Sequence, residues 1–151
     1  MNQAITAAAG FLIAVLWFDL MFDVQLRAHR DPSEAAAAPL DSISAYYHRV
    51  TTTASPMGRL VALVMLALIA GLITQAIHRD APVWVSAISI AAAGIGIGLA
   101  GARTLPAAQR LGARLDSLDV RHRAGRGILR DHLVCLAAMV TLLVTQLVGA
   151  W

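Results

Sequence analysis

Lysine is absent from the 151-residue sequence, and all 12 basic residues are arginine. There is one cysteine, Cys135, so the chain has neither an intrachain disulfide nor a cysteine-based metal framework. Aromatic residues make up only 5% of the chain and do not alternate with arginine as they do in proteins that stack on bases. These scarcities exclude a disulfide scaffold and a nucleic-acid partner.

Charged residues are also scarce, at 14%, whereas 58% of the residues are hydrophobic and the mean hydropathy is +0.68. Four apolar runs approach the roughly 20 residues that cross a bilayer core. They cover residues 5–22, 60–77, 82–102 and 128–150. We therefore predict an all-α polytopic membrane protein, with one membrane domain (1–151), four transmembrane helices in a bundle and short interfacial helices in loops 23–59 and 103–127.

The arginines predict the orientation of this bundle. Eleven of them lie around the two long loops, whereas only Arg79 lies in the short link between the second and third runs. Arginine accumulates on the cytoplasmic side, so both long loops are expected in the cytoplasm and both termini outside a bacterial inner membrane. Trp84 and Trp151 then fall at the outer interface, and Trp17 falls near the inner one. The first run has no basic residue before it and no small-residue cleavage site, so it does not read as a signal peptide.

The loops contain signals for short helices. Asp31-Pro32-Ser33-Glu34 is typical of a helix start, and Pro39 is expected to end that helix. Asp41 is expected to cap a second helix over 42–50. A third, preceded by Thr104 or Leu105 at its cap, is predicted from Pro106 to about Leu115, and residues 121–127 read as a basic linker.

Two of these helices are amphipathic, and we expect their apolar faces to lie in the lipid interface. These faces consist of Ile43, Tyr46, Tyr47 and Val50 in one helix and of Leu105, Leu111 and Leu115 in the other. Within the third span, Gly94 and Gly98 form a Gly-x-x-x-Gly pair, which favours close helix packing inside the bundle. A ligand groove against this smooth helix is the alternative.

The unusual polar residues all fall at the cytoplasmic level of the predicted bundle. Asp19, Asp23 and Arg27 are spaced by four residues and share one helix face. The fourth span begins with Arg130, Asp131 and His132, and the loops add His48, Arg49 and Arg103. Ionisable groups at this depth are retained mainly where they pair or serve a function.

Three interpretations of these residues stay open. In the first, Asp19 and Asp23 form salt bridges with Arg130, Arg103 or Arg27. In the second, His132 is a general acid or base oriented by Asp19 or Asp23, and a neighbouring arginine binds an anionic oxygen. On that basis, the candidate catalytic residues are Asp19, Asp23 and His132, and the candidate substrate-binding residues are Arg27, His48, Arg103 and Arg130.

The third interpretation is a metal site made by Asp19, Asp23, His48 and His132, whose oxygen and nitrogen atoms suit zinc, iron or manganese. No Glu-x-x-His or His-Glu-x-x-His motif supports it, and our prediction includes no metal. The sequence identifies no other cofactor.

Three stretches carry a resemblance to a known family. They are Ser55-Pro56-Met57, Arg103-Thr104-Leu105-Pro106-Ala107-Ala108-Gln109-Arg110-Leu111, and Arg130-Asp131-His132. In this layout the chain resembles the small four-span bacterial membrane proteins related to anthrone oxygenase. The resemblance implies a four-helix membrane fold and an oxygenase-like activity.

Two classes of function follow from these patterns. One is a membrane enzyme or binder, either oxygenase-like or acid–base, for a hydrophobic small molecule at the cytoplasmic end of the bundle. The other is a non-catalytic structural or accessory subunit of a larger membrane complex. The expected partners are the lipid bilayer and either a second copy of the chain or such a complex.

Overall fold

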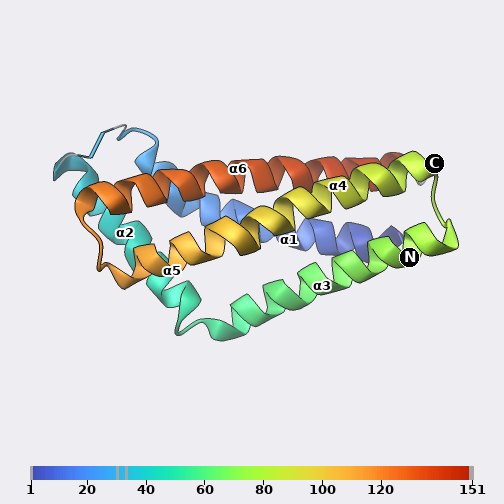
Figure 1. The fold of residues 1–151 in the computed structure, drawn as a ribbon, viewed down its shortest axis with the longest axis horizontal. Helices are drawn as coiled ribbons and strands as arrows, with labels where there is room; N and C mark the ends of the chain where they lie inside the picture. Colours follow the sequence, from blue (N-terminus) through green and yellow to red (C-terminus); the bar gives the residue numbers. More distant parts are fainter. Residues whose placement is uncertain (1, 30, 33, 150–151) are drawn as a thin grey trace.

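Four long helices run side by side along the molecule in the computed structural model, which describes residues 2–29, 31, 32 and 34–149 (Figure 1). They are α1 (Asn2–Asp23), α3 (Ser55–His78), α4 (Val83–Leu99) and α6 (Leu118–Val148). Two further helices, α2 (Glu34–Thr51) and α5 (Leu105–Ala113), lie at one end. We call this end, which also holds the first turns of α6, the polar end. The described residues form no strand, so the predicted all-α class is confirmed.

Four segments are long and apolar enough to cross a membrane, as predicted. They are Gln3–Leu26, Pro56–His78, Val83–Ala113 and Leu118–Val148, with mean hydropathies between 1.8 and 2.5. The chain therefore has the helices of a multi-pass membrane protein. Trp151 and Ser33, which entered the predictions on the interface and on the helix start, lie outside the described residues.

The prediction that residues 121–127 form a linker is wrong, because α6 already begins at Leu118. Arginine favours helix, and this segment packs on the protein through His122 and Gly125, which are both buried. A Cβ atom at Gly125 would collide with the Leu26 side chain, so the glycine permits a close approach of the two segments.

The predicted break at Pro39 is also wrong, because α2 continues through the proline to Thr51. Asp41 consequently lies inside the helix and does not cap it. A proline in a helix removes one backbone hydrogen bond. The helix continues here because Leu40, Ile43 and Tyr47 are buried in a cluster with Leu26 and residues of α5 and α6. The apolar face of α2 therefore covers protein, where lipid was expected.

The third span and α5 form one continuous helix joined by a π-helical turn, η2 (Ala100–Thr104). Thr104 stands at the N-cap position of α5, as predicted, but it is itself helical and makes no side-chain capping bond; its hydroxyl donates to the Leu99 carbonyl at 3.3 Å. The helix ends at Ala113, where Arg114 adopts a left-handed conformation with φ of 57°. Leu105 and Leu115 are exposed as expected, but Leu111 is buried against α2.

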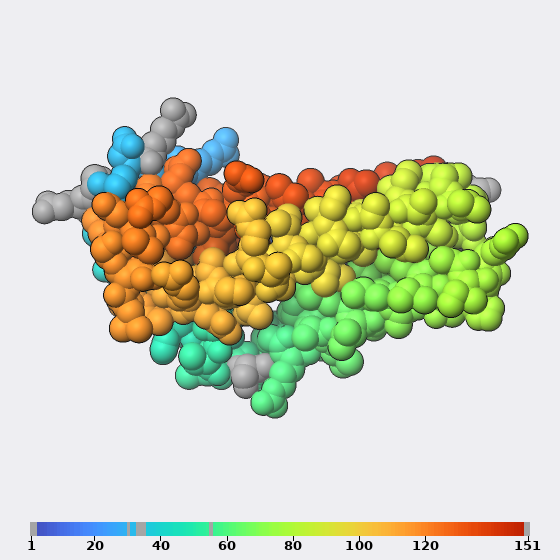
Figure 2. Space-filling model, in the orientation of Figure 1, coloured from blue at the N-terminus to red at the C-terminus, as the bar shows by residue number. Residues whose placement is uncertain are grey.

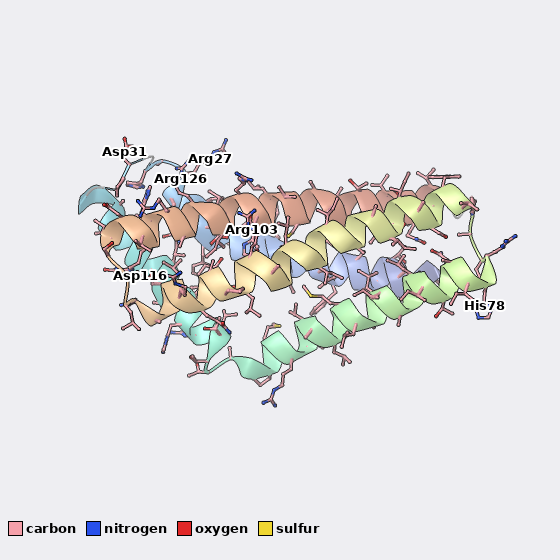
Figure 3. The ribbon with its side chains drawn as sticks, viewed as in Figure 1. Arg27, Asp31, His78, Arg103, Asp116 and Arg126 are labelled. Carbon is pink, nitrogen blue, oxygen red and sulfur yellow. The ribbon has the colours of Figure 1, made fainter. Side chains whose placement is uncertain are left out.

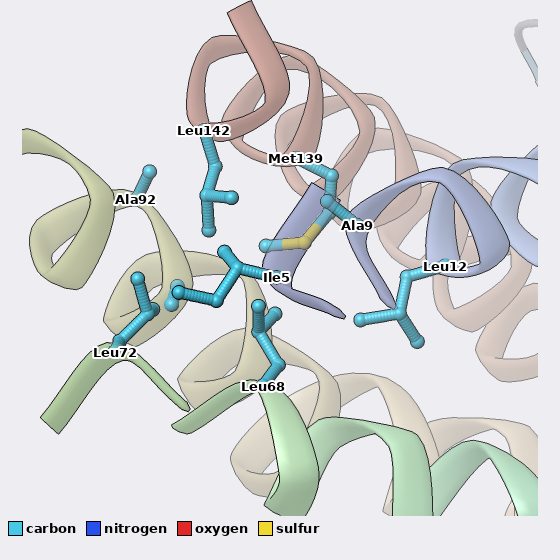
Figure 4. Close-up of a cluster of buried hydrophobic side chains, with 9 residues drawn as sticks. Ile5, Ala9, Leu12, Leu68, Leu72, Ala92, Met139 and Leu142 are labelled. Carbon is cyan, nitrogen blue, oxygen red and sulfur yellow. The ribbon is translucent and has the colours of Figure 1, made fainter. Parts of the chain in front are cut away.

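Apolar packing holds the long helices together over the rest of their length. One cluster joins all four: Ile5, Ala9 and Leu12 of α1, Leu68 and Leu72 of α3, Ala92 and Ala93 of α4, and Met139 and Leu142 of α6 (Figure 4). Beyond it, the buried side chains of Gln75 and Gln146 exchange two hydrogen bonds of 3.1 and 3.0 Å, and Gln146 also donates to Ser89 at 2.9 Å. These bonds join α3, α4 and α6, as interhelical glutamines do in membranes.

The glycine that packs tightly in α4 is Gly96, and the predicted role of Gly94 and Gly98 inside the bundle is wrong. A Cβ atom at Gly96 would lie 2.7 Å from Cε of Met139, whereas nothing lies within 4 Å of one at Gly94 or Gly98. The latter two line an apolar groove of about 260 Å³ between α3 and α4. Figure 2 shows these helices side by side, with α3 in green and α4 in yellow-green.

Candidate functional site

The centre of the candidate site is a contact between α6 and α1. Nδ1 of His132 lies 2.6 Å from Oδ2 of Asp23, and both side chains are buried. His132 belongs to the stripe of α6 that faces inward with Cys135, Met139 and Leu142, because residues three or four apart share a helix face. The amphipathic pattern of α6 thus directs the imidazole toward α1.

Tyr47 of α2 completes the surroundings of Asp23. Its hydroxyl donates to Oδ1 of Asp23 at 2.7 Å, so both carboxylate oxygens have a partner. Burial and the neighbouring carboxylate raise the pKa of Tyr47 well above its usual range. The phenol therefore stays protonated and remains a hydrogen-bond donor at neutral pH.

Asp19, one turn earlier in α1, has a matching tyrosine. The hydroxyl of Tyr46 donates to Oδ1 of Asp19 at 2.5 Å, and the Tyr46 ring stacks on Phe22 with centroids 4.0 Å apart. Burial and the Asp19 carboxylate raise the pKa of Tyr46 as well. Stacking fixes the ring, so the phenol is held in position to donate.

The imidazole of His132 lies between the two carboxylates. Its Nε2 atom is 3.9 Å from Oδ2 of Asp19, which is beyond hydrogen-bond distance. The Asp19 side chain is 17% exposed and that of Asp23 only 1%. One ring nitrogen thus faces a buried carboxylate and the other a partly accessible one, which is an arrangement suited to accepting and releasing a proton. We call Asp19, Asp23, Tyr46, Tyr47 and His132 the carboxylate–histidine cluster.

The predicted salt bridges from Asp19 and Asp23 to arginine do not occur among the described residues. Arg103 instead pairs with the buried Asp131, with Nε 3.4 Å from Oδ2, while more than half of the Arg103 side chain stays exposed. Arg27 and Arg130 are exposed. Each carboxylate instead accepts a hydrogen bond from a tyrosine hydroxyl and lies beside the imidazole of His132. These groups stabilise the charge of Asp19 and Asp23.

His48 is not part of the cluster. Successive helical residues are about 100° apart, so His48 projects from the side of α2 nearly opposite to Tyr46. It lines a different cavity, between α2 and α5. The candidate catalytic residues Asp19, Asp23 and His132 are therefore brought together, whereas the candidate binding residues Arg27, His48, Arg103 and Arg130 are distributed around the polar end. Figure 3 shows Arg27 and Arg126 near that end and His78 at the other.

The chemistry of the cluster is that of hydrogen bonding and proton transfer. Within the ranges that the structure describes, no three His, Cys, Asp or Glu side chains are arranged to hold a metal ion. Cys135, one turn beyond His132, donates to the Gly96 carbonyl at 3.3 Å and so joins α6 to α4. Cys135 therefore contributes to the packing of α6 on α4, as one residue of the inward-facing stripe of His132, Cys135 and Met139.

Sequence reasoning missed Tyr46 and Tyr47 as partners of the carboxylates. Their position on the apolar face of an amphipathic segment predicts contact with lipid. The signal that points to their role is chemical: they are the two tyrosines of the chain, they are adjacent, and each offers a donor that a buried carboxylate requires.

No family model, curated protein or solved structure matches this chain at a level that shows a relationship.

Proposed function

We propose that this protein is a small membrane enzyme or binder that acts on a hydrophobic molecule at the carboxylate–histidine cluster. One observation carries the proposal: the imidazole of His132 lies between the buried carboxylate of Asp23 and the partly exposed carboxylate of Asp19. Buried, hydrogen-bonded ionisable groups inside a membrane segment are typical of functional sites.

The geometry assigns a role to each group. Asp23 accepts a hydrogen bond from Nδ1–H of His132, which fixes the ring tautomer and leaves the Nε2 lone pair to accept a proton. Asp19, beside Nε2, stabilises the imidazolium that results. Tyr47 holds Asp23 and Tyr46 holds Asp19, so both carboxylates keep their orientation. Of the enzyme classes expected from the sequence, acid–base chemistry is the one that these side chains supply themselves.

The surroundings of Asp19 favour an apolar substrate. Asp19 belongs to the candidate span Gln3–Leu26, which has a mean hydropathy of 2.0. An apolar molecule dissolved in the hydrocarbon layer would therefore lie next to the segment that carries this carboxylate. The base would then remove a proton from a weakly acidic O–H or C–H group of that molecule.

The arginine distribution supports a location in a bacterial inner membrane, with the polar end in the cytoplasm and both termini outside. The site would then open toward the cytoplasm or the inner leaflet. Tagging each terminus and measuring its accessibility in intact cells tests this orientation, and an accessible tag inside the cell would contradict it.

An exchange experiment tests the proposed chemistry. The full chain in lipid nanodiscs is incubated in heavy water with 2-tetralone, an apolar ketone with acidic C–H groups, and deuterium uptake is followed by mass spectrometry. We expect His132→Asn to lower the protein-dependent rate by about a hundredfold or more, as the loss of a general base does. Arg123→Gln, which removes an exposed charge of α6 outside the cluster, serves as the matched control and should retain the rate. Equal rates for wild type and His132→Asn would contradict the proposal.

A second function, as a non-catalytic accessory subunit, is favoured by one specific feature. Both oxygens of Asp23 are occupied, and the cluster ties α1, α2 and α6 together. These contacts stabilise the packing of the three helices whether or not a substrate binds. This function predicts that the protein co-purifies with a larger membrane complex, and a stable, solitary chain in detergent would count against it.

A further inference from the structure

A second site lies on the other side of α2, where the cavity that contains His48 has a volume of about 480 Å³. The second half of α2 contributes Ala45, His48 and Arg49, and the end of α5 contributes Gly112 and Arg114. Thr53, in the turn after α2, and Ala113 complete the lining. The cavity shares no residue with the carboxylate–histidine cluster.

The cavity lies beside a point where α2 and α5 pack closely. A Cβ atom at Gly112 would lie 2.7 Å from the backbone nitrogen of His48 and 2.9 Å from its Cα atom, so α2 and α5 touch there through their backbones. Beyond this contact, α5 ends at Arg114 in the left-handed conformation. Nη2 of Arg114 donates to the backbone carbonyl of Asp41 at 2.8 Å, which anchors the arginine to α2.

The charge of the cavity is positive. Its lining includes Arg49, Arg114 and His48 and contains no acidic residue. In the described part of the chain, the Arg49 guanidinium has no hydrogen-bond or ion-pair partner, so its N–H groups are available to bind an anion. The acids of the adjoining segments are already paired: Asp41 with Arg121 at 2.6 Å and Asp116 with Arg110 at 3.2 Å.

We propose that this cavity binds a phosphate group, carried either by an anionic lipid headgroup or by free inorganic phosphate. Two arginines around one cavity match the charge and the acceptor atoms of phosphate. The side chains of Arg49 and Arg114 are exposed, so a phosphate group can reach both.

The position of the cavity suits a lipid headgroup. Thr53 comes shortly before Pro56, where a candidate span begins, so the cavity lies beside the level at which an apolar helix meets its polar surroundings. Met57 and Leu60, in the first turns of that span, are exposed apolar side chains next to which an acyl chain can lie. This inference is independent of the function proposed for the carboxylate–histidine cluster.

Native mass spectrometry of the full chain in detergent tests the inference with three probes: phosphatidylglycerol, diacylglycerol with the same acyl chains, and inorganic phosphate. We expect one phosphatidylglycerol to bind and Arg49→Gln to weaken it about tenfold, the effect of losing one charge-assisted hydrogen bond. Arg123→Gln, which removes an exposed arginine of α6 outside the cavity, should bind as the wild type does. Ala45→Leu fills the cavity without changing its charge and should also weaken binding.

The probes distinguish the two sources of phosphate. Displacement of phosphatidylglycerol by millimolar inorganic phosphate would identify free phosphate as the ligand, and retention of the lipid would identify the headgroup. Diacylglycerol should bind equally weakly to wild type and Arg49→Gln. The proposal is overturned if Arg49→Gln and Arg123→Gln bind both phosphatidylglycerol and inorganic phosphate with the same affinity.

Discussion

Nδ1 of His132 lies 2.6 Å from Oδ2 of Asp23, although 109 residues separate them in the chain. The contact joins the last span to the first, and Tyr47 extends it to α2 through the other oxygen of Asp23. A buried carboxylate and a buried imidazole cost free energy unless they satisfy each other. Their pairing therefore helps to fix how the spans pack and also creates a centre that can hold a proton.

The two tyrosines should differ in their contribution to stability. Tyr47→Phe leaves one oxygen of the buried Asp23 without its donor, so we expect a loss of about 1–3 kcal/mol. Tyr46→Phe should cost less, about 0.5–1.5 kcal/mol, because water can reach the partly exposed Asp19. Denaturant unfolding of both variants in detergent measures the difference, and a larger loss for Tyr46→Phe would contradict this account.

The same phenols predict how the protein behaves at high pH. The pKa values of both tyrosines are raised by burial and by the aspartates, whereas an unfolded tyrosine has a pKa of about 10. Their contribution to stability should be fully present below pH about 10 and should be lost as the pH rises from there through the raised folded values.

An absorbance titration near 295 nm follows this ionisation, because the chain has only these two tyrosines. Folded protein should show no tyrosinate at a pH where the denatured chain shows both. A folded protein that ionises like the denatured chain would contradict the two hydrogen bonds.

Gly112 and Gly127 form a matched pair for testing helix packing. Gly112→Ala forces a methyl group into the backbone of α2 at His48, so we expect a loss of about 1–3 kcal/mol. Gly127→Ala, within α6, meets nothing within 4 Å and should stabilise the helix by about 0.5–1 kcal/mol. Thermal unfolding of the two variants in detergent should therefore shift in opposite directions, and equal shifts would show that α2 and α5 are farther apart.

The buried glutamine pair should show energetic coupling. Gln75→Leu and Gln146→Leu each remove one member of a reciprocal pair, at an expected cost of about 0.6–2 kcal/mol. The double variant should lose less than the sum, because the second substitution leaves no unpaired amide from the first. Thr141→Val, whose hydroxyl bonds within its own helix, is the control. Additive losses would indicate that the two amides do not interact.

The sequence predicted the spans because hydropathy directly reports which segments can lie in hydrocarbon. It also predicted that Asp19, Asp23 and His132 share one depth, and the structure brings these residues together. It did not predict their partners, because the apolar face of α2 can cover lipid or protein, and only the packing of α2 on α1 and α6 decides between them.

The errors have the same origin. The Gly94 and Gly98 spacing is a signal for close packing on some surface, but which face of α4 turns inward depends on Met139 and Cys135 of α6. The charge of residues 121–127 predicts a linker, whereas the helix propensity of their arginines favours a helix. Burial of His122 and Gly125 favours the helix. Tertiary contacts, which no local pattern contains, settled each case.

The central claim, that the carboxylate–histidine cluster holds a hydrophobic molecule, is tested most directly by what the protein carries. Wild type, His132→Asn and the control Arg123→Gln are purified from membranes, and their organic extracts are compared by mass spectrometry after subtraction of bulk lipids. We expect a hydrophobic molecule in near-stoichiometric amount in wild type and Arg123→Gln, and its loss from correctly folded His132→Asn. Extracts of the same composition from all three proteins would contradict the claim.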